Sequence, residues 1–144
     1  MLDKTLILNI GIPRSGKSTW TRDYIQHRTG IVVVNPDSIR LALHGKPFLE
    51  EREVEVWHIA RTMVRALFLA GHSEVILDAC SHTHKRRKAW LSPEWECRYK
   101  CFDTSKVLCI ERALANAQEY LIPVIERMSR EITFPTENLY EITE

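Results

Sequence analysis

The chain has 144 residues, of which 44% are hydrophobic, and 20 basic residues against 19 acidic ones leave a formal net charge of +1. This length predicts a single domain over residues 1–144, with one core and little room for a second folded unit. The near-neutral balance excludes a strongly basic nucleic-acid carrier, so any affinity for phosphate must come from local groups of cations and backbone amides.

The apolar runs are all short. The longest, at residues 6–10 and 31–34, fall far below the roughly 20 residues that a membrane span requires, and no secretion signal is visible at the amino terminus. We therefore expect a soluble, cytoplasmic protein that has no membrane partner. Its four cysteines are then expected to stay reduced, because cytosolic thiols do not form lasting disulfides.

Strand-like and helix-like patterns alternate along the chain. Near-continuous apolar runs predict buried parallel strands at residues 5–10, 31–34 and 74–78, and a fourth strand is predicted at 99–102. Helical spacing and stop signals predict helices at residues 19–28, 50–70, 84–90, from about 105, and 123–130. The tail after Phe134 is expected to be extended and to be a candidate for one more edge strand.

The helix predicted at residues 50–70 is the longest and begins with acidic residues. Its apolar residues are assigned to one face: Val54, Trp57, Ile59, Ala60, Met63, Val64, Leu67 and Phe68. The alternation as a whole predicts an α/β fold, an open parallel sheet of four to five strands with helices on both faces.

A phosphate-binding motif lies directly between the first strand and the first helix. The segment Gly11-Ile-Pro-Arg-Ser-Gly16-Lys17-Ser18 fits GxxxxGK(S/T). In such a loop the amides and the helix amino terminus face the phosphates, Lys17 reaches the β and γ phosphates, and the Ser18 hydroxyl binds magnesium. We therefore predict binding of ATP and Mg²⁺ through Gly11, Pro13, Arg14, Ser15, Gly16, Lys17, Ser18 and Thr19.

The third strand delivers a carboxylate, Asp78, to the carboxyl edge of the sheet, where ligands of open α/β folds bind. We interpret Asp78 as a partner of magnesium, directly or through its waters. The alternative is that Asp78 only caps the turn that follows it.

The segment Asn35-Pro-Asp37-Ser-Ile-Arg40 leaves the second strand at the same edge. Asp37 is thus placed to orient an acceptor hydroxyl and take its proton, and Arg40, three residues later, to hold an anionic group of the acceptor. The alternative is structural, with Asp37 capping a helix that starts near Ser38 and Arg40 solvated.

Four segments together, GIPRSGKSTW, NPDSIR, VILDACSHTHKRRKAW and PVIERM, resemble the 5′-kinase domain of phage polynucleotide kinase and related small P-loop kinases. The resemblance implies that Asp37 is the general base, that Arg40 grips a substrate phosphate, and that Lys17 and Ser18 are the P-loop lysine and serine. At the RRxAW match it favours one of the arginines facing the nucleotide side, with Trp90 packed inside, and we assign Arg87 to substrate binding.

The chain departs from this family in three places. The lid-like segment, about residues 109–123, keeps only Arg112 before an alanine-rich stretch, so either Arg112, Arg127 or Arg130 replaces the lid arginine or turnover is slow. Arg14 stands in the loop where glycine is frequent. Asn138 replaces the glycine of a PxxxEGFDxI-like ending.

The sequence therefore predicts a kinase that moves the γ-phosphate of ATP to a hydroxyl, with the 5′-hydroxyl of an oligonucleotide as the leading acceptor. A kinase of a nucleoside, nucleotide or other small alcohol is the second possibility. An ATP-binding regulatory protein with weak catalysis is the third. The acceptor and the oligomeric state cannot be read from the sequence.

Overall fold

The computed structural model describes residues 3–140. Its centre is a sheet of four parallel strands in the order β2-β3-β1-β4. The strands are β1 (Thr5–Ile10), β2 (Ile31–Val34), β3 (Glu74–Leu77) and β4 (Glu96–Cys101). The predicted α/β class with an open parallel sheet is confirmed.

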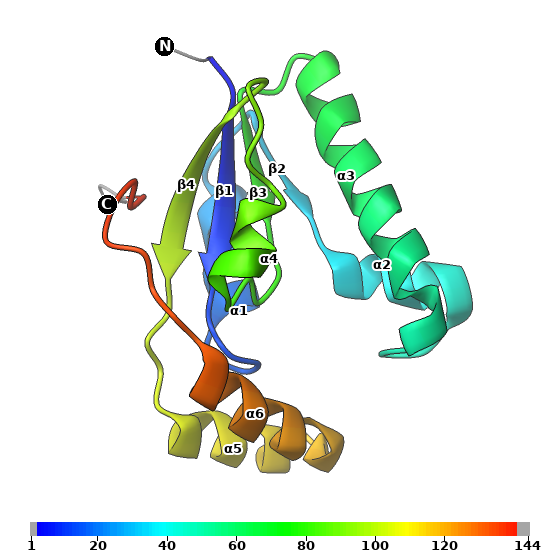
Figure 1. The fold of residues 1–144 in the computed structure, drawn as a ribbon, viewed down its shortest axis with the longest axis vertical. Helices are drawn as coiled ribbons and strands as arrows, with labels where there is room; N and C mark the ends of the chain where they lie inside the picture. The colour runs from blue at the N-terminus through cyan, green and yellow to red at the C-terminus, as the bar shows by residue number, and fades with distance from the viewer. Residues whose placement is uncertain (1–2, 141–144) are drawn as a thin grey trace.

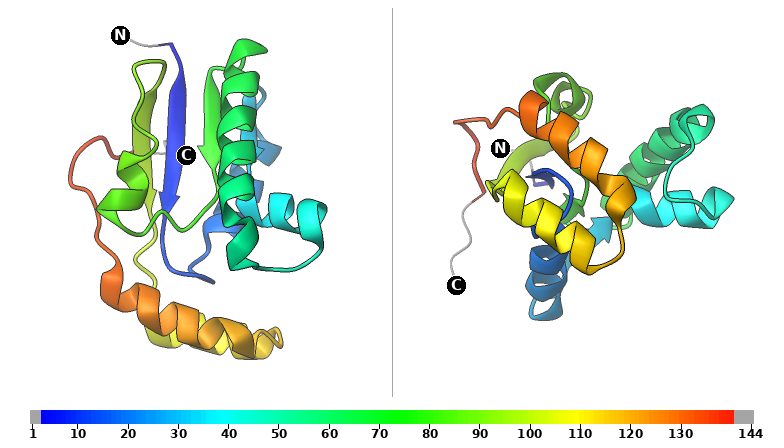
Figure 2. Two further views of the ribbon diagram at one scale, coloured as in Figure 1. Left: turned by 45° about the vertical axis from the view of Figure 1, so that its right-hand side comes forward. Right: turned by 90° about the horizontal axis from the view of Figure 1, so that it is seen from below.

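Within residues 3–140 the strands are accompanied by six α-helices: α1 (Lys17–Gln26), α2 (Pro36–His44), α3 (Glu53–Leu69), α4 (His84–Lys88), α5 (Lys106–Ala115) and α6 (Ile122–Glu131). Short 3-10 turns precede α3 and α6, at Glu50–Arg52 and Glu119–Leu121. Figures 1 and 2 show α3 beside the sheet and the pair α5 and α6 side by side beyond the carboxyl ends of the strands.

Both faces of the sheet are covered, as predicted. Alternate residues of β1 point to opposite faces. Leu6 and Leu8 join one core cluster with α3, whereas Ile7 joins another with Tyr24 of α1. Each of these side chains of β1 is fully buried, so the strand that leads into the phosphate loop is held rigidly from both sides.

The strand order fixes where a ligand can bind. From β1 the chain crosses by α1 to β2 on the far side of β3, and from β3 it crosses back to β4 on the other side of β1. The connections after β1 and β3 thus leave in opposite directions, and ligands of open α/β sheets bind at the carboxyl ends of such neighbouring strands. The residues following β1 and β3 therefore lie where a ligand of this sheet would bind.

The structure corrects the predicted face of α3. Its fully or nearly buried residues are Val56, Ala60, Val64 and Phe68, a stripe that repeats every four residues, as one helical face does. Val54, Ile59 and Met63 are instead exposed. The prediction was wrong here because it pooled apolar residues from two sides of the helix.

Strand β4 begins three residues earlier than predicted, at Glu96 rather than 99. The charged residues Glu96, Arg98 and Lys100 alternate along it and hid its start from a search for continuous apolar runs. Such alternation is typical of an edge strand, one side of which is solvated.

The carboxyl-terminal tail runs along this edge. The amide of Tyr99 donates to the carbonyl of Asn138 at 3.0 Å, and the amide of Tyr140 donates to the carbonyl of Tyr99 at 2.8 Å. The tail thus adds a single parallel bridge, Tyr99 to Leu139, where an edge strand was a candidate. The end of the predicted motif, Glu141 and Ile142, lies outside the described residues.

Asn138 has a backbone φ of 56°, in the left-handed region that asparagine tolerates better than most residues. This explains why asparagine can stand where the related ending has glycine. Among residues 3–140, no helix is both long and apolar enough to cross a bilayer.

Candidate functional site

The loop between β1 and α1 has the backbone that its glycines predict. Gly16 has φ 103°, a left-handed conformation that strains other residues. At Gly11 a Cβ atom would collide with Oγ of Ser15 and crowd the backbone of Phe102. Gly16 also begins α1 without a side-chain cap, so the first amides of the helix keep their N–H groups for a ligand.

Lys17 lies inside this loop. Its side chain is buried, and Nζ donates to the carbonyl of Ile12 at 2.8 Å and to Oγ of Ser15 at 3.4 Å. Both acceptors are neutral, so the positive charge of Lys17 has no carboxylate partner among the described ion pairs. A buried cation with only neutral partners favours an anionic ligand at this loop.

Arg14 takes the position in the loop where glycine is frequent. Its φ of 67° is left-handed, which is the conformational reason for that glycine preference. Nε of Arg14 is buried with no acceptor among the described residues, while its carbonyl accepts a 3.0 Å hydrogen bond from Nη1 of Arg112. The structure therefore brings Arg112 of α5 to the phosphate loop.

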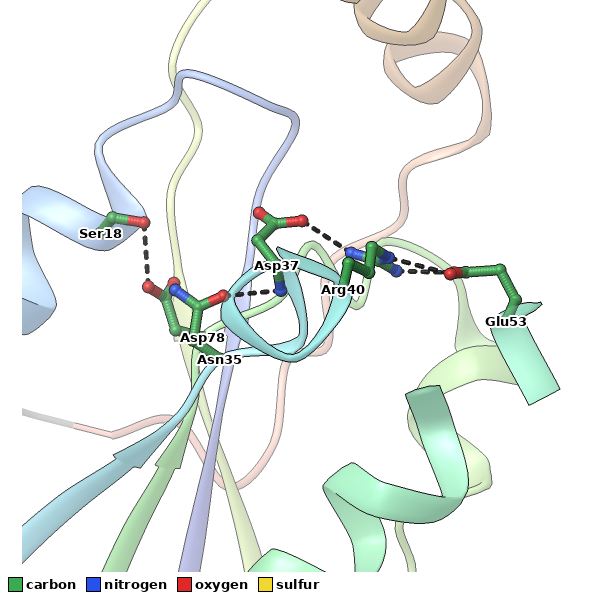
Figure 3. A network of polar contacts seen from close by, with 6 residues as sticks. All are labelled: Ser18, Asn35, Asp37, Arg40, Glu53 and Asp78. Atoms are coloured by element: carbon green, nitrogen blue, oxygen red, sulfur yellow. Dashed lines mark hydrogen bonds and ion pairs between the residues drawn. The ribbon is translucent and has the colours of Figure 1, made fainter. Parts of the chain in front are cut away.

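Ser18 and Asp78 meet at the junction of β1 and β3. Oγ of Ser18 donates to Oδ2 of Asp78 at 2.9 Å (Figure 3). Nδ2 of Asn9 donates to Oδ1 of Asp78 at 3.3 Å. The carboxylate is thereby directed toward the phosphate loop. No side-chain cap from Asp78 to the following turn is found among the described hydrogen bonds.

A hydroxyl and one carboxylate are oxygen ligands of the kind that magnesium prefers, since this ion keeps several of its waters. No cluster of three or more His, Cys, Asp or Glu side chains that would hold a metal by itself occurs in residues 3–140. The Nε of Arg14 has no hydrogen-bond acceptor among the described residues, and the start of α1 has no side-chain cap. The residues present therefore fit a nucleoside triphosphate bound with magnesium.

Asp37 follows β2 at the same edge, because the amide of Asp78 donates to the carbonyl of Val34 at 3.0 Å and so fixes the two strand ends side by side. The helix cap here is Asn35, whose side chain accepts from the amide of Asp37 at 2.8 Å. The alternative prediction that Asp37 caps a helix near Ser38 is therefore wrong. The carboxylate of Asp37 is instead 78% exposed.

Arg40 connects Asp37 to a residue that the sequence did not single out. Its guanidinium pairs with Asp37 at 2.6 Å and, through two parallel hydrogen bonds of 2.9 and 2.7 Å, with Glu53 at the start of α3 (Figure 3). Arg40 is thus not solvated. The acidic first turn of α3 was visible in the sequence, but only the packing of α2 on α3 reveals its partner.

These charges raise the pKa of Arg40: burial alone would lower it, and the hydrogen bonds and charges of Glu53 and Asp37 outweigh that effect. The guanidinium is therefore a fixed positive charge. Three of its five N–H groups serve the two carboxylates, and the other two have no partner among the described hydrogen bonds.

Arg87, predicted to bind substrate, is buried. It donates to the carbonyl of Ser81 at 3.0 Å and to the carbonyl and hydroxyl of Thr133, each at 2.9 Å. Its hydrogen bonds thus tie the segment after β3 to the end of α6. Trp90 is buried in the core, as expected. The substrate role of Arg87 remains a prediction that these contacts do not favour.

The segment predicted to be lid-like, about residues 109–123, forms most of α5, the 3-10 turn and the first residues of α6, which pairs with α5 as a hairpin. Ile12 of the phosphate loop packs in one cluster with Cys109 and Ala113 of α5 and Ile125 of α6. At its other end the hairpin is held by His82, whose Nε2 contacts Glu131 at 3.2 Å. Burial lowers the pKa of His82.

Residues 6–131 match the model of the AAA domain family AAA_33. One chain in a structure of a Pnkp1/Rnl/Hen1 complex is 26% identical, with a TM-score of 0.69, 76% of this chain covered and 38% of that chain. A chain in a Pnkp1/Rnl/Hen1 RNA repair complex is 20% identical, with a TM-score of 0.70 and coverage of 93% and 48%. The present chain thus spans less than half the length of these proteins.

Two smaller proteins are similar over most of their own length. A gluconokinase from Sinorhizobium meliloti 1021 is 13% identical, with a TM-score of 0.65, 96% of this chain covered and 82% of that one. The Mycobacterium tuberculosis APS kinase CysC, solved with AMPPNP and APS, is 17% identical, with a TM-score of 0.63 and coverage of 96% and 88%.

These likenesses confirm the expected resemblance to small P-loop kinases. The family model covers the chain from β1 to the end of α6 and so includes the phosphate loop and the carboxyl edge of the sheet. The chain therefore belongs to the AAA domain family AAA_33 and has the fold of the P-loop kinases.

Proposed function

We propose that the protein is a kinase that transfers the γ-phosphoryl group of ATP to a hydroxyl acceptor, and that this acceptor is the 5′-hydroxyl of an oligonucleotide. The observation that carries the proposal is the pairing of Asp37 with Arg40 at 2.6 Å, at the strand edge that also carries the phosphate loop. A carboxylate and a cation side by side match an acceptor that presents a hydroxyl and a phosphate.

In this proposal the loop residues Gly11, Pro13, Arg14, Ser15, Gly16, Lys17, Ser18 and Thr19 hold the triphosphate. The backbone N–H groups of this loop, which Pro13 lacks, and the charge of Lys17 face the β and γ phosphates. Ser18 and Asp78 would hold magnesium, which when bound neutralises charge on the phosphate oxygens. The positive charge of Lys17 also offsets the negative charge on the phosphate oxygens while the phosphoryl group leaves ADP.

Asp37 orients the acceptor hydroxyl and receives its proton as the hydroxyl oxygen attacks phosphorus. Its 78% exposure means that the carboxylate is open to a substrate. Arg40 uses its free N–H groups for the phosphate on the 3′ side of the acceptor nucleotide. Arg112, which reaches the phosphate loop through the carbonyl of Arg14, supplies charge stabilisation to the transferring group in place of a lid arginine.

A kinase of a small alcohol is the second candidate, and the pairing of Arg40 with Glu53 favours it. Two parallel hydrogen bonds hold the guanidinium to Glu53, so a phosphate on Arg40 must be bound beside the Glu53 carboxylate rather than in its place. An acceptor without a phosphate would avoid the repulsion between that phosphate and Asp37.

The test is transfer of labelled γ-phosphate from ATP to three acceptor classes: 5′-hydroxyl oligonucleotides, nucleosides, and small alcohols such as sugar acids. We expect the highest kcat/KM with oligonucleotides and no transfer by Lys17→Ala. Preference for a small alcohol would replace the proposal by the second candidate. Tight ATP binding without transfer to any of the three acceptor classes would instead support an ATP-binding regulatory protein.

A further inference from the structure

An aromatic side chain, Phe48, lies beside Arg40, one of the two residues proposed to bind the acceptor. It lies in the short connection between α2, which ends at His44, and the 3-10 turn at Glu50–Arg52. Its side chain is 58% exposed and belongs to none of the core clusters. Exposure of one apolar residue is common and by itself indicates no binding site. The evidence for a site comes from the residues that surround Phe48.

The neighbour of Phe48 is Arg40. The guanidinium carbon of Arg40 lies 5.9 Å from the centre of the Phe48 ring and 5.8 Å from the centre of the Trp57 ring. Cations are attracted to aromatic faces at such distances. Because Glu53 and Asp37 hold the same guanidinium, the position of the Phe48 ring is tied to that of the proposed base.

The connection that carries Phe48 is also restricted by its sequence. Gly45 ends α2 in a left-handed conformation, with φ 76°, and Pro47 has a fixed φ. A ring held on a restricted loop loses little conformational entropy when a ligand packs on it. Phe48 is therefore suited to be a preformed contact surface.

The order of groups is Asp37, Arg40 and Phe48, that is, carboxylate, cation and exposed aromatic ring. A 5′-terminal nucleotide carries three matching groups: a hydroxyl, a phosphate on its 3′ side and a flat base. Bases stack on aromatic side chains with little dependence on sequence. A sugar acid has no such flat face.

We propose that Phe48 binds the base of the 5′-terminal nucleotide of the acceptor by stacking. The inference rests on the proposed polynucleotide kinase function and deepens it, because it assigns a residue that distinguishes a base-bearing acceptor from a simple phosphorylated alcohol. Of the acceptor, Phe48 contacts only the base, so it acts on acceptor binding and takes no part in the transfer of the phosphoryl group.

The test compares two oligonucleotides that differ only at the 5′ end, one with a normal nucleotide and one with an abasic tetrahydrofuran residue that keeps the hydroxyl and the phosphate. We expect the wild type to prefer the base-bearing acceptor about tenfold in kcat/KM, chiefly through KM, as loss of one stacking contact implies. Phe48→Ala should remove this preference and leave the abasic acceptor unchanged. Phe48→Trp should restore it.

Leu69→Ala is the control, since Leu69 is 84% exposed at the opposite end of α3 and should leave the preference intact. A Phe48→Ala variant that loses rate equally on both acceptors, or that keeps the wild-type preference, would overturn the role of Phe48 while the kinase function stands. If the wild type phosphorylates neither oligonucleotide but does phosphorylate a small alcohol, the function and the inference both fail.

Discussion

At the scale of single residues, the arrangement around Arg40 is the most informative feature. One guanidinium serves two carboxylates, of which Glu53 is 18% exposed and Asp37 is 78% exposed. The pair with Glu53 is bidentate and shielded, whereas an exposed ion pair contributes only about 0.5 kcal/mol. We infer that Glu53 fixes Arg40 and that Asp37 is free to exchange this contact for a substrate.

Asp37→Asn tests the proposed base. Asparagine keeps the shape and the contact with Arg40 but cannot accept the proton, so kcat should fall on the order of a hundredfold, with ATP affinity and melting temperature near those of the wild type. Steady-state kinetics and thermal denaturation measure both. An Asp37→Asn enzyme with wild-type kcat would exclude Asp37 as the base.

Arg112→Ala tests the arginine that reaches the phosphate loop. If Arg112 stabilises the transferring group, kcat falls by about a hundredfold or more while KM for ATP changes little. If it only ties α5 to the carbonyl of Arg14, ATP affinity and thermal stability fall together instead. Arg65→Ala is the control, because its exposed guanidinium pairs with Glu94 and has no contact with the phosphate loop among the described hydrogen bonds.

At the scale of elements, two nearby residues at the start of α2 have different roles: Asn35 caps the helix, and Asp37 is the proposed base. The structure assigns the cap to Asn35 and not to Asp37. Asn35→Ala should therefore lower the free energy of unfolding by about 1 kcal/mol, Asn35→Asp should retain it, and Asp37→Ala should cost less than Asn35→Ala. Urea denaturation of the three variants measures these values. A larger loss in Asp37→Ala would return the capping role to Asp37.

Elements were predictable from sequence to different degrees. The buried strand β1 matches its prediction over residues 5–10, because continuous burial on both faces leaves a continuous apolar run. The edge strand β4 was predicted to begin three residues too late, because one side of it is solvated and its charged residues interrupt the apolar run. In α3, helical periodicity was clear, but which of two apolar sides faces the sheet depends on how α3 packs against β2 and β3.

At the scale of the whole molecule, ligand binding should be coupled to stability, because the site joins β1, β3 and the α5–α6 hairpin. Magnesium and ATP at about a hundred times Kd should raise the free energy of unfolding by about 2.7 kcal/mol. Lys17→Ala should lose this gain with and without magnesium. Asp78→Asn should lose only the part that magnesium adds.

Differential scanning calorimetry with ATP plus EDTA, and with ATP plus magnesium, measures both parts of this gain. The control is Asp23→Asn, an exposed residue on α1, which should behave as the wild type. An Asp78→Asn protein that keeps the full magnesium effect would remove Asp78 from the proposed metal site.

The sequence by itself determined the fold class and the phosphate loop, because strand periodicity and glycine conformation are local properties of consecutive residues. It also singled out Asp37, Arg40 and Asp78, since each lies at or shortly after the carboxyl end of a predicted strand. Only the tertiary structure decided what these side chains touch. The pairing of Arg40 with Glu53, the burial of Arg87 and the place of Phe48 beside Arg40 depend on how α2 packs on α3 and how α6 returns to the sheet, and contacts between distant segments leave no local pattern in the chain.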